Sequence, residues 1–107
     1  MTNQKKKPVL TNPVTIPAVV LHLLDVEGES YGQDLLEKIK ARTGGRLVAG
    51  WGSIYPALYH LEEGGFIVAC GESSGKTGRA RKMYKITKDG RKRAAHNREI
   101  VAALFVA

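Results

Sequence analysis

Apolar residues in the first part of the chain recur three and four positions apart, which is the period of a helix that buries one face. One such series predicts a helix from about residue 13 or 15 to Val26, with a core-facing stripe of Ile16, Val19, Val20, Leu23 and Leu24. A second series predicts a helix that opens at Ser30, because Ser30 and Gln33 have the spacing of a capping box. This helix should end among the basic residues and glycines of residues 40–45.

The third predicted helix lies in residues 50–65, which read GWGSIYPALYHLEEGG. Ser53 is expected to cap its start, with Pro56 in the first turn, where a missing N–H costs little. Trp51 should pack onto the core just before the helix as a hydrophobic staple. An apolar stripe is expected to face the core and consists of Ile54, Leu58 and Leu61. The outer face of the helix then carries Tyr55, Tyr59 and His60.

Two short runs after this helix predict a β-hairpin. Residues 66–70 are apolar, and residues 83–86 place Tyr84 and Ile86 on one face of a strand. Residues 71–78, between the two runs, are rich in turn-forming residues. The hairpin is therefore expected to have a flexible, basic tip.

The last predicted helix begins at a Thr87 cap and contains Gly90, which should slightly weaken its start. Its second half is apolar, and no later element of the sequence can cover it. A two-fold dimer would bury this stripe, since soluble domains rarely expose such a surface. The alternative is a helix that folds back on the first helix. The residues expected at the dimer interface are Ile100, Val101, Leu104 and Phe105.

The predicted order is three helices, a β-hairpin and a further helix. This is a mainly α fold with a small β-hairpin. This order is typical of a winged helix-turn-helix, whose third helix enters the major groove of DNA while the hairpin follows the backbone. We expect a flexible basic arm at residues 1–12, a winged helix-turn-helix domain at residues 13–87 and a dimerisation helix at residues 88–107.

Positive charge is concentrated in the second half of the chain. The net charge is +7, and residues 76–98 hold ten basic residues and the single acid Asp89. A dense region of one sign favours a polyanionic partner. A solvated basic surface and an anionic membrane surface are the alternatives, and the membrane is disfavoured because this stretch has no wide apolar face.

Few residues could support catalysis or metal binding. The three histidines are scattered and there is one cysteine, so neither a metal-ligand spacing nor an internal disulfide is available. Residues 71–77 end in Gly-Lys-Thr but are one residue short of a phosphate loop. No apolar run could span a membrane, and no signal peptide is recognisable. We therefore expect a cytoplasmic protein that is not an enzyme and needs no cofactor.

Two stretches resemble the PadR family of bacterial transcriptional regulators: GSIYPALYHLEEGGFI at residues 52–67 and GRARKMYKITKDGR at residues 78–91. The Tyr31-Gly32 opening of the second helix is similar as well. The resemblance implies a homodimeric winged-helix regulator or repressor that binds double-stranded DNA. It also implies a short member with one C-terminal helix, and it leaves room for a small-molecule effector.

The candidate DNA contacts come from the second and third helices and from the hairpin. Tyr55 and Tyr59 have an alternative role, which is to pack against the hairpin. Arg81 and Lys82 should point to opposite faces of their strand, so that only one of them meets DNA. The residues predicted to bind DNA are Tyr31, Lys40, Arg42, Ser53, Tyr55, Pro56, Tyr59, His60, Lys76, Arg79, Arg81 and Lys82.

Two other functions are compatible with the same pattern. A winged-helix module could bind a protein through the aromatic face of the third helix, although the excess of positive charge argues against it. An RNA-binding role is the second, but no stacking platform of a usual RNA-binding motif is present.

Overall fold

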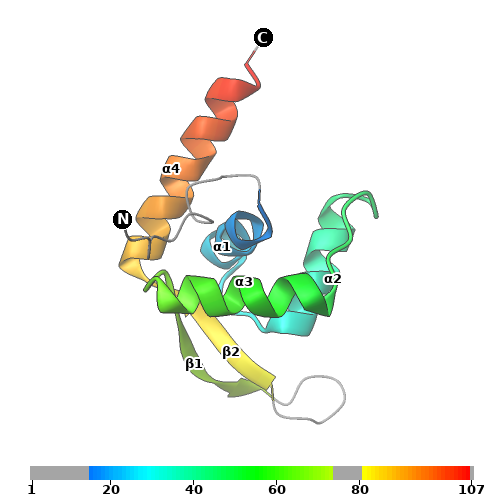
Figure 1. Cartoon of the computed structure of the whole chain (residues 1–107), viewed down its shortest axis with the longest axis vertical. Coiled ribbons are helices and arrows are strands. Elements are labelled where there is room, and N and C mark those ends of the chain that lie inside the picture. Colours follow the sequence, from blue (N-terminus) through cyan, green and yellow to red (C-terminus); the bar gives the residue numbers. More distant parts are fainter. Residues whose placement is uncertain (1–14, 74–80, 107) are drawn as a thin grey trace, which may run out of the picture.

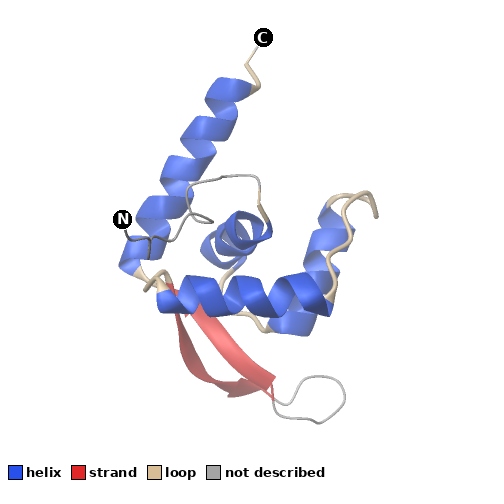
Figure 2. Ribbon diagram, in the orientation of Figure 1, coloured by secondary structure: helices blue, strands red, loops and turns tan. Residues whose placement is uncertain are grey.

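The computed structural model describes residues 15–73 and 81–106. The predicted basic arm and the hairpin-tip residues Lys76 and Arg79 lie outside the described residues. The order of elements confirms the winged helix-turn-helix prediction (Figures 1 and 2). The elements are α1 (Ile16–Glu27), α2 (Gly32–Arg42), α3 (Trp51–Glu63), β1 (Ile67–Ser73), β2 (Arg81–Ile86) and α4 (Lys88–Leu104).

The core is built around α1, which packs against α2, α3, α4 and β2. Val20, Leu23 and Leu24 of the predicted stripe are buried, and so is Leu21, which lies off that stripe. A helix that is covered on most of its sides buries apolar residues nearly all round. The predicted stripe of α3 faces this core, with the buried residues Ile54, Leu58 and Leu61.

The predicted capping box at Ser30 is wrong. The second helix begins at Gly32, with Tyr31 at the N-cap position and no side-chain cap. The Ser30 hydroxyl instead donates to the carboxylate of Asp34. Ser30 also exchanges both backbone hydrogen bonds with Tyr84 of β2, at 3.1 and 2.8 Å. Long-range pairing with the hairpin therefore holds Ser30 in an extended conformation outside the helix.

The start of α3 also differs from the prediction. The helix begins at Trp51 with Gly50 as its N-cap, so Ser53 lies inside the first turn and is not the cap. Pro56 does not lie in the first turn but in the helix interior. It has no N–H to donate to the carbonyl of Gly52 there. Trp51 is not a core staple, because it is the first helical residue and 43% of its surface is exposed.

A left-handed glycine turns the chain from α3 into the hairpin. Gly65 has a φ of 80°, whereas Gly64 keeps a right-handed conformation. The amides of Gly65 and Phe66 donate to the carbonyls of Glu62 and Leu61 at 3.0 and 2.9 Å. This pair of bonds is a Schellman motif, which satisfies the last carbonyls of the helix.

The hairpin pairs β1 and β2 antiparallel, from Ile67 opposite Ile86 to Ser73 opposite Arg81, with an irregularity between Ala69 and Gly71. Both strands extend beyond the predicted runs. Tyr84 and Ile86 are buried on one face, as predicted. The hairpin is therefore anchored to the core through one side of β2 and through the buried Ile67 of β1.

Thr87 links the hairpin to α4. Its hydroxyl accepts from the amide of Gly90 at 3.0 Å, which confirms the predicted cap, and donates to the carbonyl of Gly65 at 2.7 Å. Gly90, expected only to weaken the helix, lies where a Cβ would come within 2.1 Å of the Phe66 carbonyl oxygen. The close approach of α4 to the hairpin thus requires a glycine there.

Candidate nucleic-acid interface

The outer face of α3 is exposed and polar-aromatic. Ser53, Tyr55, Pro56, Tyr59 and His60 all lie on the surface, because the core stripe occupies the other side of the helix. Tyr55 is 55% exposed and Tyr59 is 59% exposed. The rings of Tyr59 and His60 pack edge to face, with 5.6 Å between their centroids. The exposed fraction of Tyr59 favours a partner over packing against the hairpin.

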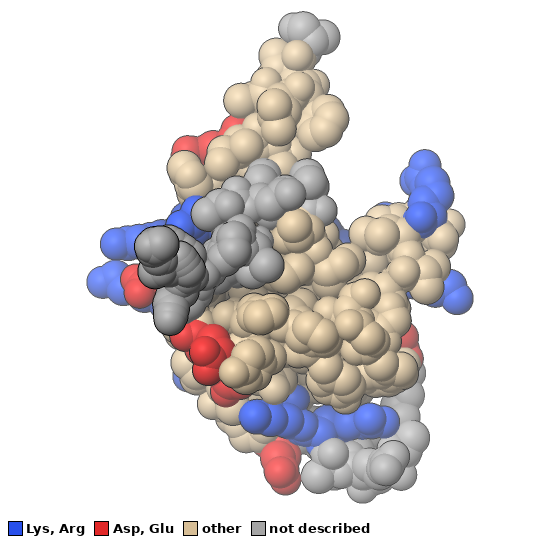
Figure 3. Space-filling view, in the orientation of Figure 1, with Lys and Arg blue, Asp and Glu red and all other residues tan. Residues whose placement is uncertain are grey.

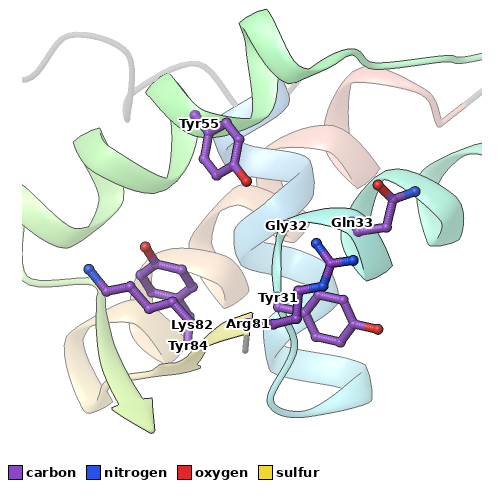
Figure 4. A pocket seen from close by; sticks show the side chains of 7 residues that line it. All are labelled: Tyr31, Gly32, Gln33, Tyr55, Arg81, Lys82 and Tyr84. Carbon is purple, nitrogen blue, oxygen red and sulfur yellow. The ribbon is translucent and has the colours of Figure 1, made fainter. Parts of the chain in front are cut away.

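A polar pocket lies where α3 meets the start of α2 and the start of β2 (Figure 4). Its volume is about 320 Å³. The hydroxyl of Tyr55 points from α3 toward the side chains of β2. We call this site the α2–β2 pocket, and its lining residues are Tyr31, Gly32, Gln33, Tyr55, Arg81, Lys82 and Tyr84.

Two cations line this pocket, each held beside an aromatic ring. The Arg81 guanidinium lies 5.7 Å from the ring centroid of Tyr31, and the Lys82 ammonium lies 5.5 Å from that of Tyr84. Both residues line the pocket although they occupy neighbouring positions of the strand, and the prediction that only one of them meets DNA stays a prediction. Their long alkyl stems bring both charged ends to one side of the strand.

The two basic residues predicted on α2 are not brought to this pocket. Lys40 and Arg42 lie at the far end of the helix, and eight residues of helix separate Lys40 from the pocket residue Gly32 by roughly 12 Å. Lys40 is exposed, while Arg42 forms an ion pair with Glu27 at 3.0 Å. A DNA contact from these two residues stays a prediction.

Positive charge lies beside α3 and is absent from the helix itself, whose sequence WGSIYPALYHLEE ends in two glutamates. Figure 3 shows Lys and Arg side chains over the hairpin, beside the surface that covers α3. Some of the basic residues of α4 serve a structural purpose instead. Arg91 and Arg98 both bind the carboxylate of Asp25, at 3.2 and 2.9 Å, and so fasten α4 to α1.

The histidine on α1 belongs to this α1–α4 contact and not to the α3 surface. Burial lowers the pKa of His22, and the nearby positive charges of Arg98 and Arg42 lower it further. The ring is therefore neutral at pH 7, and its Nδ1 accepts from Arg98 at 3.4 Å in the tautomer protonated at Nε2. Within residues 15–73 and 81–106, no group of three potential ligands could hold a metal ion.

One residue of this surface was missed by the sequence analysis. Trp51 stacks on Tyr55 with a centroid distance of 5.2 Å and an angle of 19° between the rings. The two residues are four positions apart on one helix, and this spacing indicates the contact once α3 is known to start at Trp51. None of the described helices is long and apolar enough to span a bilayer.

Three helices packed into one core, an exposed third helix and a hairpin with cations at its side define a winged helix-turn-helix DNA-binding protein. Residues 20–96 match the family model described as the Transcriptional regulator PadR-like family. The chain belongs to this family of transcriptional regulators, which confirms the resemblance seen in the sequence.

Solved structures agree with this assignment. The chain is 27% identical to a transcriptional regulator from Clostridium thermocellum, with a TM-score of 0.67 and coverage of 94% of this chain and 99% of that one. It is 26% identical to Bacillus subtilis PadR, solved in complex with operator DNA, with a TM-score of 0.66. The match covers 89% of this chain and 49% of that one. No curated protein matches the sequence.

Proposed function

We propose that this protein is a homodimeric, sequence-specific DNA-binding repressor. The observation that carries the proposal is the exposed outer face of α3, which is polar-aromatic from Trp51 to His60 and carries no lysine or arginine, beside the cationic α2–β2 pocket. The similar Bacillus subtilis PadR was solved in complex with operator DNA, which supports the same kind of partner here. A dimer that occupies its operator would repress by blocking access to the promoter.

In this proposal α3 enters the major groove and the α2–β2 pocket takes a backbone phosphate. Arg81 and Lys82 supply two cations at the pocket. The pocket also opens at the start of α2, where the helix dipole favours a negative group. Lys82 is only loosely held by Glu62, at 4.0 Å, and such an exposed pair is worth at most about 1 kcal/mol. The ammonium group can therefore turn to a phosphate at little cost.

The dimer would form through the end of α4. The first part of α4 lies against α1, while its C-terminal end extends beyond the rest of the fold (Figure 1). Ile100 and Val101 are half-buried, but Leu104 and Phe105 are 66% and 76% exposed. A second copy would cover the apolar end of α4.

Tyr59→Ala tests the role of α3. Duplexes would first be selected from a randomised pool with the intact protein, and affinity for the selected duplex would then be measured by fluorescence anisotropy. We expect Tyr59→Ala to weaken binding by about tenfold or more, in line with a base contact worth about 1–3 kcal/mol. The melting temperature should change little, because Tyr59 is largely exposed.

Val26→Ala is the matched control, since Val26 is an exposed apolar residue on α1 that lies outside the proposed interface. It should leave both affinity and melting temperature unchanged. A Tyr59→Ala variant that binds normally, or that melts at a much lower temperature, would remove Tyr59 from the proposed interface.

A further inference from the structure

The aromatic stack of Trp51 and Tyr55 forms an exposed apolar surface on the first turns of α3. The two rings are nearly parallel and 5.2 Å apart between centroids. Gly32, the first residue of α2, lies directly beneath them, since a Cβ there would be 3.5 Å from a Trp51 ring atom and 3.6 Å from a Tyr55 ring atom. The stack is thus supported from below by α2, while its outer side faces solvent.

The polar groups that usually read purines are missing from α3. Guanine is commonly recognised by Arg or Lys and adenine by Asn or Gln, through paired hydrogen bonds in the major groove. The sequence of α3, WGSIYPALYHLEE, contains none of these four residue types. Gln33 lies nearby on α2 and not on α3, and one of its amide N–H groups donates to Glu37 at 3.0 Å. The outer face of α3 therefore offers hydroxyl groups, an imidazole and apolar ring surface along its first turns, with the carboxylate of Glu63 at its C-terminal end.

The cations of the interface lie on a different element. Arg81 and Lys82 come from β2 and line the α2–β2 pocket, on the side of Tyr55 that faces the hairpin. Phosphate binding and base contact are thus separated in space. With the phosphates bound by the hairpin side, the Trp51–Tyr55 stack is left to meet the edges of bases.

We infer that the Trp51–Tyr55 stack reads thymine, by packing against its C5-methyl group in the major groove. This inference rests on the proposed function and adds to it the class of base that the start of α3 selects. The thymine methyl is the apolar group among the four base edges of the major groove. Covering one methyl group with apolar surface corresponds to about a fourfold gain in affinity.

Deoxyuridine substitution tests this inference, because it removes the methyl group and leaves the hydrogen-bonding edge intact. Each thymine of the selected duplex would be replaced in turn, and affinity would be measured by fluorescence anisotropy. We expect the affinity of the intact protein to fall about fourfold when deoxyuridine replaces thymine at one or more positions of each half-site. Trp51→Ala should bind thymine and deoxyuridine equally at those positions.

Two further variants separate the stack from general damage to α3. Trp51→Phe keeps an aromatic ring on Tyr55 and should retain part of the preference for thymine. Tyr59→Ala should bind more weakly overall but keep the full preference, because Tyr59 is outside the stack. A melting curve for each variant confirms that it is folded.

Three results would overturn the inference while leaving DNA binding intact. The first is a selected half-site that contains no thymine. The second is an intact protein whose affinity does not change when deoxyuridine replaces thymine at any position. The third is a Trp51→Ala variant that prefers thymine to deoxyuridine as strongly as the intact protein does. Failure to select any duplex would instead overturn the proposed function, on which the inference depends.

Discussion

The double substitution Leu104→Glu/Phe105→Glu is expected to turn the protein from a dimer into a monomer and to weaken operator binding by about 100-fold or more. The two side chains are among the most exposed apolar groups of the described chain, at the end of α4 that projects from the fold. Two linked half-site contacts gain roughly 10²–10⁴ in affinity over one, and a monomer forfeits that gain. Folding should be preserved, since neither side chain belongs to the core.

Sedimentation equilibrium at micromolar concentration measures the first effect, and anisotropy with the selected duplex measures the second. Glu99→Lys is the control, because Glu99 is exposed and lies on the opposite side of α4 from Val101 and Leu104, about 160° and about 140° around the helix. It should remain a dimer. If the intact chain sediments as a monomer, or the doubly charged variant as a dimer, the end of α4 is not the dimer interface.

Gly90→Ala is expected to destabilise the fold by about 2–3 kcal/mol, which is typical of an overpacked site. The new Cβ would lie 2.1 Å from the Phe66 carbonyl oxygen and 2.6 Å from a side-chain carbon of Ile86. Phe66 cannot move freely, because its carbonyl accepts from the amide of Thr87 at 3.0 Å. Helix propensity alone would favour alanine by about 1 kcal/mol, so the sign of the change tests the close packing.

Thermal unfolding monitored by circular dichroism measures this change in stability. The melting temperature of Gly90→Ala should fall by roughly 10 °C or more for a domain of this size. Gly52→Ala is the matched control, since Gly52 is also helical but a Cβ there meets no atom within 4 Å. That variant should melt at the same temperature or slightly higher. An equal response of the two variants would show that α4 does not approach the hairpin so closely.

Much of the fold follows from apolar periodicity. The stripes of α1 and α3 and the alternating face of β2 correspond to the buried residues, and the Thr87 cap lies where the sequence places it. The errors arise where distant contacts override local preference. Ser30 has the chemistry of a helix cap, but its backbone pairs with Tyr84 more than fifty positions later. Nothing in the local sequence around Ser30 reports that pairing.

The candidate site was only partly predictable for the same reason. Tyr55 and Tyr59 are outward because the helical stripe of α3 is clear in the sequence. The α2–β2 pocket joins three elements that are distant in the sequence, so Arg81 and Lys82 could not be assigned to one site. Trp51 was misplaced because the N-cap of the helix was set three residues late, at Ser53 rather than at Gly50.

The salt dependence of binding tests the proposed DNA interface most directly. Affinity for the selected duplex would be measured at several salt concentrations with the intact protein and with Arg81→Gln/Lys82→Gln. DNA binding through this face predicts a steep fall of log affinity with log salt, with a slope that the double variant reduces by about 0.9 for each lost phosphate contact. A flat dependence for the intact protein, or an unchanged slope in the variant, would contradict this interface.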